Sequence, residues 1–341
     1  MRVELRSDTF TVPTARMRKA MYDAEVGDDV FAEDPTVNSL EEQSAALCGK
    51  EAALFVPSGT MANQICVRVQ APRGSEIILQ EEAHLWVHEV GGLAALAQVQ
   101  TCLTKGKGGI IQPDELPSLF RINDIHCPPT KLVCIEQTSM MAGGTIYPLE
   151  IIQAIARIAQ ERGAKVHMDG ARLFNAVVAS GIPAAAYASP VDSLMFCLSK
   201  GLGCPVGSMV VGSADFIKEA RVARKLYGGG MRQVGVLAAC GLVALEEMIQ
   251  RLAEDHQKAQ ILAEVIQNCS KVEPDWPWPQ TNIVVFGLKE GNAALMERKL
   301  AEQGVFCLAM EDNQRIRLVT HKDVSFDQIR YANGVLEELL N

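Results

Sequence analysis

The 341-residue chain lacks the marks of several large classes of protein. No apolar segment approaches the roughly 20 residues that a membrane-spanning helix needs, and the first residues hold no apolar run of signal-peptide length. There is no block of basic residues, and the net charge is −9. We therefore expect neither nucleic acid nor an anionic membrane surface as a partner, and any anionic ligand must be held by local groups.

Two motifs are also missing. The ten cysteines are scattered singly and none forms a C-x-x-C pair. This favours reduced, mostly buried thiols in a cytoplasmic protein over a disulfide framework. The pattern G-x-x-x-x-G-K-[ST] is absent as well, so nothing indicates a nucleoside triphosphate ligand.

What is present is the composition of a globular protein with a sizeable core, because 48% of the residues are hydrophobic and 21% are charged. Short β-branched runs alternate with segments of helical period, such as 148–163, through the first two thirds of the chain. This alternation predicts an α/β domain with a mostly parallel sheet covered by helices. The predicted strands are 52–57, 76–80, 131–138, 165–169, 193–199 and 208–213.

The pattern changes after Gly228. A long helical stretch is followed by short strands with helices between and after them, which predicts a smaller α+β domain at the C-terminal end. We expect residues 1–45 to pack back on the rest, residues 46–240 to form the large ligand-binding domain, and residues 241–341 to form the small domain.

A single charged residue, Lys200, lies in the apolar, glycine-rich stretch "MFCLSKGLGCPVGS" (195–208). One interpretation is a lysine that extends its ammonium group to solvent at a strand end. The other is a desolvated amine able to form a Schiff base with an aldehyde, with the glycines leaving room for a bulky ring. The stretch alone does not separate the two.

Two further features accompany this lysine. Asp169 ends the strand "KVHMD", where an acid in a parallel sheet points into the ligand crevice, although it could equally cap the next helix. Ser58, Gly59 and Thr60 join a strand to a helix and could bind an anion through the helix N-terminus, or simply begin the helix.

His84 and His88 stand four residues apart on a predicted helix, a spacing that can bind zinc. However, Leu85 stands where H-E-x-x-H has glutamate and no third ligand is evident, so we expect no metal. His84 could instead be a ring placed over a flat ligand, or a core histidine.

The combination is more specific than its parts. An anion cradle, an imidazole, a strand-end aspartate and a lysine follow one another in that order along the chain. Pyridoxal phosphate (PLP) needs each of them, because the lysine binds its aldehyde, the aspartate keeps its pyridine nitrogen protonated and the helix N-terminus holds its phosphate.

Seven long motifs, spread over nearly the whole chain and in the correct order, resemble those of the low-specificity L-threonine aldolases. Members of that family are PLP enzymes of the aspartate-aminotransferase-like fold, fold type I. The motifs are "LRSDTFTVPT", "AEVGDDVFAEDPTVNSLEEQ", "FVPSGTMANQ", "HMDGARLFNA", "CLSKGLGCPVGS", "GGGMRQ" and "IRLVTH".

The resemblance implies roles for particular residues. Lys200 would carry the cofactor, Asp169 would pair with the ring nitrogen, and His84 would stack on the pyridine face. The resemblance places the phosphate at Ser58, Gly59 and Thr60.

The same resemblance assigns Ser7, Arg172 and Arg317 to the substrate carboxylate, with Arg172 also near the cofactor. Arg315 lies two residues from Arg317 on the same face of a predicted strand, which weakens the choice between them. His84 and His126 are the two imidazoles that could take the substrate proton.

The loop "LYGGGMRQ" would approach the site of a neighbouring subunit, where Lys225 and Arg232 would help bind phosphate. This implies a homodimer or homotetramer.

The implied reaction is retro-aldol cleavage of L-threonine, L-allo-threonine and related β-hydroxy-α-amino acids to glycine and an aldehyde such as acetaldehyde. A phenylserine-type aldolase, a β-eliminating PLP lyase of the same fold, or a protein that binds PLP without catalysis are the alternatives. The chain departs from the family pattern after Glu136, where Gln137, Thr138 and Ser139 replace a common Asn-Thr-His segment, so the preference between the two threonine diastereomers stays open.

Overall fold

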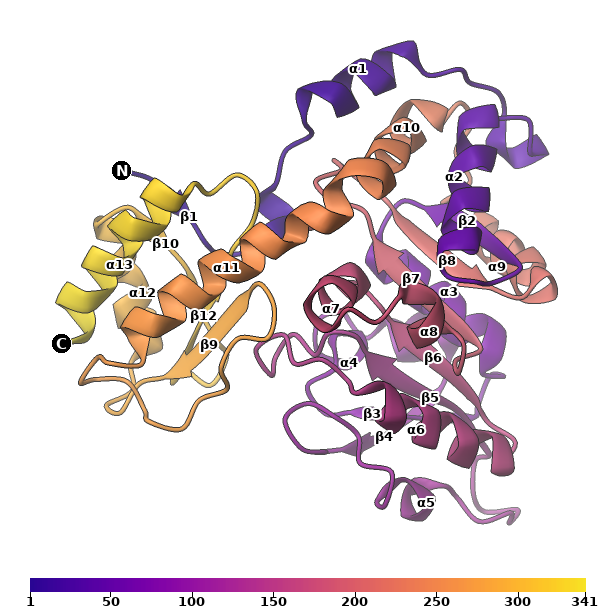
Figure 1. Cartoon of the computed structure of the whole chain (residues 1–341). Helices are drawn as coiled ribbons and strands as arrows, with labels where there is room; N and C mark the ends of the chain where they lie inside the picture. Colours follow the sequence, from indigo (N-terminus) through magenta and orange to yellow (C-terminus); the bar gives the residue numbers. More distant parts are fainter.

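The computed structural model describes all 341 residues. Its centre is a seven-stranded sheet in the order β2-β8-β7-β6-β5-β3-β4 (Figure 1). Only β8 runs antiparallel to its neighbours, so the predicted mostly parallel α/β sheet is confirmed. The strands are β2 (Ala52–Val56), β3 (Glu76–Gln80), β4 (Gln100–Thr104), β5 (Thr130–Glu136), β6 (Lys165–Asp169), β7 (Ser193–Cys197) and β8 (Ser208–Gly212).

Helices cover both faces of this sheet, which is why the central strands are apolar along their whole length. Alternate residues of β7 show the division: Met195 and Cys197 join a cluster with α3 and α9, whereas Leu194 and Phe196 join the largest cluster of the protein. The helices of this domain are α2 (Pro35–Leu47), α3 (Gly59–Gln70), α4 (His84–Val87), α5 (Leu116–Leu119), α6 (Leu149–Glu161), α7 (Leu173–Ser180), α8 (Ala184–Ala188), α9 (Ala214–Leu226) and α10 (Gly235–Val243).

The C-terminal part has its own cluster of 23 buried hydrophobic residues. It contains a three-stranded antiparallel sheet in the order β11-β12-β9. A helical stretch leads into it from α10 through residues 244–248 to α11, so the predicted division at 240/241 falls within that stretch (Figure 1). Its elements are α11 (Ile249–Ile266), β9 (Ile283–Gly287), α12 (Ala293–Glu302), β10 (Val305–Phe306), β11 (Leu308–Ala309), β12 (Arg315–Val319) and α13 (Phe326–Leu340).

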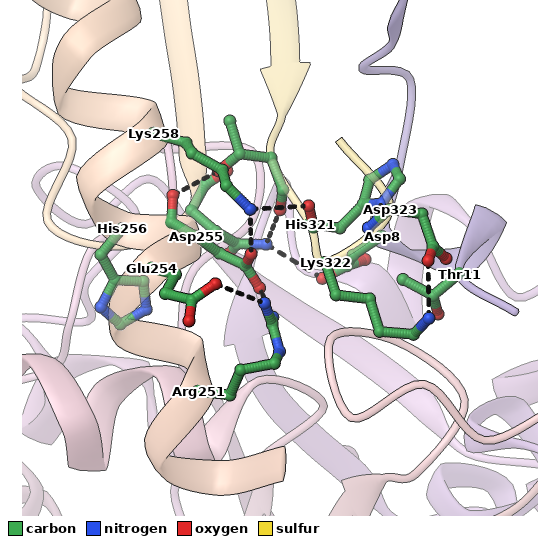
Figure 2. Close-up of polar contacts among 12 residues, drawn as sticks. Asp8, Thr11, Arg251, Glu254, Asp255, His256, Lys258, His321, Lys322 and Asp323 are labelled. Carbon is green, nitrogen blue, oxygen red and sulfur yellow. Dashed lines mark hydrogen bonds and ion pairs between the residues drawn. The ribbon is translucent and has the colours of Figure 1, made fainter. Parts of the chain in front are cut away.

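The N-terminal segment bridges the two parts. Strand β1 (Val3–Glu4) pairs in parallel with β10, while α1 (Ala15–Asp23) packs against α10. The backbone amide of Val12 donates to Asp323 (2.9 Å), and Nε2 of His321 bonds the carbonyl of Glu4 (3.0 Å). The segment between these contacts, which contains Asp8, is thereby held beside the small domain (Figure 2).

A cluster of opposite charges lies on α11 at this junction. Asp255 is fully buried and forms ion pairs with Arg251 and Lys258, the second at 3.6 Å (Figure 2). Thr320 Oγ1 donates to the backbone carbonyl of Asp255 (2.6 Å), which ties the end of β12 to α11. We call Arg251, Asp255 and Lys258 the hinge cluster.

No helix of the structure is both long enough and apolar enough to span a membrane.

Candidate functional site

Three predicted residues meet at the carboxyl edge of the large sheet. Asp169 is the last residue of β6, and Lys200 follows β7 by three residues. Because β6 and β7 are parallel, their carboxyl ends lie side by side at the place where α/β sheets bind ligands. His84 begins α4, four residues after β3, which β5 separates from β6 in the same sheet.

Lys200 is half-buried, and its ammonium group has neither a hydrogen bond nor an ion pair within the chain. Its position is set by its backbone, since its carbonyl accepts hydrogen bonds from Thr11 Oγ1 (2.8 Å) and from the amide of Gly203 (2.9 Å). The lysine is close enough to the rest of the site for its charge to lower the pKa values of Asp8 and His84. Lys200 therefore has a fixed backbone and an ammonium group without a partner in the chain.

Asp169 is almost fully buried, and both of its carboxylate oxygens accept hydrogen bonds. Oδ1 accepts from the amide of Ala171 (3.0 Å), as a residue capping a turn would. Oδ2 accepts from Nδ2 of Asn63 (2.8 Å), a residue of α3 that the sequence analysis did not single out. The Asp169 side chain thus caps the following turn and also lies at the sheet edge where a ligand would bind.

Glu89 is a second buried acid that the sequence analysis missed. Its Oε1 lies 2.9 Å from Nδ1 of His84 and accepts from Nδ2 of Asn63 at 2.7 Å, while Oε2 accepts from Gln64 (2.7 Å). Burial opposes protonation of His84, but the bond to Glu89 and the charge of Asp169 together raise the pKa of the imidazole. His84 is thus held from one side by a carboxylate, whereas His88 is exposed.

Glu136, at the end of β5, completes this edge. Its Oε2 accepts from the backbone amide of His84 (3.1 Å) and its Oε1 from that of Met140 (3.1 Å). Burial first, and then the charge of Asp169, raise the pKa of Glu136 to about 7. The sequence carried the same signal as for Asp169, because both acids end a buried strand.

The strand-to-helix turn at residues 58–60 has the form of an anion cradle. Ser58 caps α3 by accepting from the amide of Met61 (3.2 Å), and the first amides of the helix have no intrahelical partner. A Cβ on Gly59 would lie 2.9 Å from the sulfur of Cys197, so only glycine allows this helix start to sit directly on β7. Thr60 is exposed beside it.

The three residues assigned to a carboxylate differ in their partners. Arg172 is buried and its guanidinium is bound by both oxygens of Asp8 (2.8 and 2.7 Å). Ser7 Oγ accepts from the amide and the hydroxyl of Thr9 (3.2 and 2.9 Å). Arg317 has no acidic partner, and its Nε is buried without any hydrogen bond.

Arg315 and Arg317 have different partners in the structure. Arg315 is neutralised by Glu82 (3.1 Å) and Asp312 (2.5 Å). Arg317 instead contacts the sulfur of Met140 (3.2 Å), and burial together with the charge of Arg172 lowers its pKa to about 10. The unpaired cation is therefore Arg317, which fits an anionic ligand.

Comparison with known proteins agrees with this geometry. The family model described as beta-eliminating lyase matches residues 4–289. Low-specificity L-threonine aldolase 1 of Arabidopsis thaliana is 41% identical over 344 residues, covering 99% of this chain and 96% of the relative. The chain belongs to the beta-eliminating lyase family. Its resemblance to the low-specificity L-threonine aldolases within that family is confirmed.

Two solved structures support the fold of this family member. The threonine aldolase of Leishmania major has a TM-score of 0.85 at 19% identity, covering 98% of this chain and 99% of that one. A structure of SPT with PLP has a TM-score of 0.76 at 18% identity, covering 98% and 86%. The predicted fold type I architecture is confirmed.

Two segments that the resemblance assigns to the site lie outside the cluster around Asp169. His126 lies in an exposed loop before β5, at the amino end of a seven-residue strand whose carboxyl end carries Glu136. Strand geometry separates the two ends by about 20 Å, so the loop of His126 precedes the edge of the sheet opposite to Glu136, and the role of His126 as a base stays a prediction. The helix α5 and the loop after it lie on the side of the large domain away from the small domain (Figure 1).

The glycine loop 228–230 packs on the first turn of α3, where a Cβ on Gly229 would lie 2.3 Å from the sulfur of Met61. Lys225 and Arg232 at its ends are both exposed, and Arg232 pairs with Asp28 (3.0 Å). Their assignment to a phosphate of a neighbouring subunit stays a prediction.

The departure at residues 137–139 has a structural role. The side chain of Gln137 is fully buried and bonds the backbone of Tyr147 in both directions, at 2.9 and 3.2 Å. It braces the loop after β5 against Tyr147. The effect of the exchange on the preference between the two threonine diastereomers stays open.

Proposed function

We propose that the chain is a PLP-dependent aldolase that cleaves L-threonine, L-allo-threonine and related β-hydroxy-α-amino acids to glycine and an aldehyde. The observation that carries the proposal is the unpartnered Lys200 at the same sheet edge as the buried Asp169, in a chain 41% identical to a low-specificity L-threonine aldolase. The β-eliminating activity that the family description suggests is the competing function.

The residues present fit the cofactor by three separate observations. Lys200 supplies a free amine, Gly59 lets the start of α3 sit directly on β7 so that its first amides form the cradle, and Asp169 supplies a buried carboxylate. Lys200 would hold the aldehyde carbon of PLP, Ser58 to Thr60 the phosphate, and Asp169 the proton of the ring nitrogen. When bound, PLP withdraws electrons from the α-carbon of an amino acid.

Substrate binding follows from the unpaired cation. Arg317 offers its guanidinium to the substrate carboxylate, since a planar fork binds a carboxylate through two parallel hydrogen bonds. Arg172 is occupied by Asp8 and contributes its charge and orientation beside Arg317. Ser7 lies in the same N-terminal segment as Asp8 and adds a hydroxyl.

Proton transfer points to His84. Because Glu89 binds Nδ1, the neutral ring carries its proton there and leaves Nε2 as a free acceptor for the β-hydroxyl proton. The raised pKa of His84 makes the imidazole a stronger proton acceptor, and also means that more of it is already protonated at a given pH. A contribution of His126 would require a second copy of the chain, which agrees with the proposed homodimer or homotetramer.

The ten cysteines, all free thiols, support a reducing compartment such as the cytoplasm.

The test is replacement of Lys200 by alanine in PLP-loaded protein, measured by borohydride reduction with mass spectrometry and by product analysis from L-threonine and L-allo-threonine. We expect the wild type to form a reducible lysine adduct and to release glycine and acetaldehyde, and Lys200→Ala to do neither. The exposed Lys218 on α9 provides the control, because Lys218→Ala should change nothing. Retention of both properties by Lys200→Ala would sink the proposal, and ammonia with an α-keto acid as products would establish β-elimination instead.

A further inference from the structure

A chain of buried hydrogen bonds runs from Asp169 through the interior to the far end of α3. Asn63 Nδ2 donates to Asp169 Oδ2 (2.8 Å), and Asn63 Oδ1 lies 3.1 Å from Nε2 of His167 on β6. His167 Nδ1 lies 2.9 Å from Ser193 Oγ, which lies 2.5 Å from Nε2 of Gln70. None of these side chains is more than 6% exposed.

The two ends of this series of hydrogen bonds determine which group donates and which accepts in each bond. At one end, Asn63 faces carboxylates of both Asp169 and Glu89, so both must receive its amide hydrogens. At the other end, Gln70 faces the backbone carbonyl of Cys66 at 3.2 Å, which can only accept. Each amide therefore has one possible orientation.

The hydrogen positions of the two central residues follow from Asn63 when the imidazole is neutral. Asn63 Oδ1 can only accept, so His167 must donate from Nε2 and its Nδ1 must be the acceptor of the neutral ring. Ser193 then receives a hydrogen from Gln70 and donates its own to His167. Every hydrogen in the chain points toward Asp169. We call Gln70, Ser193, His167 and Asn63 the polar relay.

We propose that the polar relay is a positioning device for Asp169, which holds the carboxylate in one orientation through Asn63. Hydrogen bonds aligned in series polarise one another, so the last donor, Asn63, binds the carboxylate more strongly than an isolated amide would. The functional part of the inference rests on the proposed function, whereas the direction of the relay does not.

The surroundings of His167 agree with a neutral ring. Burial lowers the pKa of His167 to about 4, against the opposing charge of Asp169. The other titratable groups packed beside it are thiols, Cys66 of α3 and Cys134 of the paired strand β5. Burial raises the pKa of each thiol far above its usual range, so neither carries a charge.

The first test needs no cofactor. In protein labelled with 15N-histidine, the wild-type His167 should be a single neutral tautomer with its proton on Nε2, unprotonated down to about pH 5. Gln70→Glu replaces the terminal donor by an acceptor of the same shape, so Ser193 must donate to it and His167 must donate to Ser193. We expect the pKa of His167 to rise into the range between pH 5 and 8 in this variant.

Gln160→Glu is the matched control, because Gln160 lies on the wall of the same surface pocket as Gln70 but outside the relay. It adds the same charge and should leave His167 unchanged. If Gln70→Glu does not fold, Ser193→Ala removes a single buried hydroxyl and should shift the Nδ1 resonance of His167 alone. The relay would be overturned if the wild-type His167 ring carries its proton on Nδ1, or if the 15N resonances of His167 are unchanged in both Gln70→Glu and Ser193→Ala.

The second test asks whether the relay acts on the reaction. In PLP-loaded protein, Gln70→Glu should lower kcat about tenfold and leave KM within about twofold, since Asp169 does not bind the substrate carboxylate. The pH dependence of the visible absorbance should shift with it, whereas Gln160→Glu should match the wild type. The positioning role would be refuted if NMR shows the relay in the wild type and Gln70→Glu nevertheless keeps the wild-type kcat and absorbance. A wild type without the lysine adduct would instead refute the proposed function.

Discussion

The hinge cluster and the candidate site are both rich in buried charge, but they balance it differently. In the hinge cluster, the buried Asp255 is flanked by two cations, Arg251 and Lys258, and no carboxylate or cation is left alone. In the site, Lys200 and Arg317 have no acidic partner at all. Burying a cation without a partner is costly, so such groups persist where a ligand supplies the missing charge. Incomplete charge balance thus locates the site better than residue type does.

The largest effect is expected from breaking the hinge cluster. Asp255→Asn leaves Lys258 buried with no opposing charge and Arg251 with only the exposed Glu254. Removing one member of a buried ion pair costs about 3–5 kcal/mol, which urea unfolding measures directly. Glu254→Gln is the control and should cost less than about 0.5 kcal/mol, because its 3.6 Å pair is on the surface. Equal losses in the free energy of unfolding of the two variants would show that the buried and the surface ion pair do not differ.

The site should respond in the opposite way. Arg317→Leu should raise KM for L-threonine about 100-fold, since hydrogen bonds to charged groups contribute about 1.5–3 kcal/mol. Its free energy of unfolding should stay equal to the wild type or rise, because a half-buried cation without an acidic partner is removed. The neighbouring Arg315 offers the matched variant, Arg315→Leu, for which we expect KM within about threefold of the wild type. A stability loss in Arg317→Leu as large as that of Asp255→Asn would contradict the comparison.

Asp8 connects the two regions, since it pairs with Arg172 and accepts from Asn282 (3.2 Å). Burial favours its neutral form, but the charge and hydrogen bonds of Arg172 outweigh burial and lower the pKa of Asp8 from 3.8 to about 2. Because the folded pKa lies below the unfolded one, the carboxylate stabilises the protein above about pH 4. This contribution, about 2 kcal/mol, is lost as the pH falls toward 2.

Urea unfolding between pH 5 and pH 2 checks this expectation. Wild type should exceed Asp8→Asn in stability by about 2 kcal/mol at pH 5, and the difference should shrink as the acid protonates. A gap that keeps its full size at pH 2 would show that Asp8 acts through packing and not through its charge.

Local patterns explain which elements were predictable. The strands that contain Asp169 and precede Lys200 were found within two residues of their predicted ends, because apolar runs between glycines and polar turns are local signals. The predicted helix around His84 and His88 was too long. It ends at Val87, since Val90 and Gly91 adopt left-handed backbone angles (φ 55° and 69°) that stop a right-handed helix.

The sequence by itself determined the order of cradle, imidazole, aspartate and lysine, and with it the family and the proposed cofactor. The tertiary structure decided which charges are left unpaired: Arg317 and not Arg315, with His126 outside the cluster around Asp169. It also revealed Asn63 and Glu89 around Asp169 and the relay behind them. These features depend on contacts between residues tens to hundreds of positions apart, which no local periodicity encodes, because the fold alone brings such side chains within hydrogen-bonding distance.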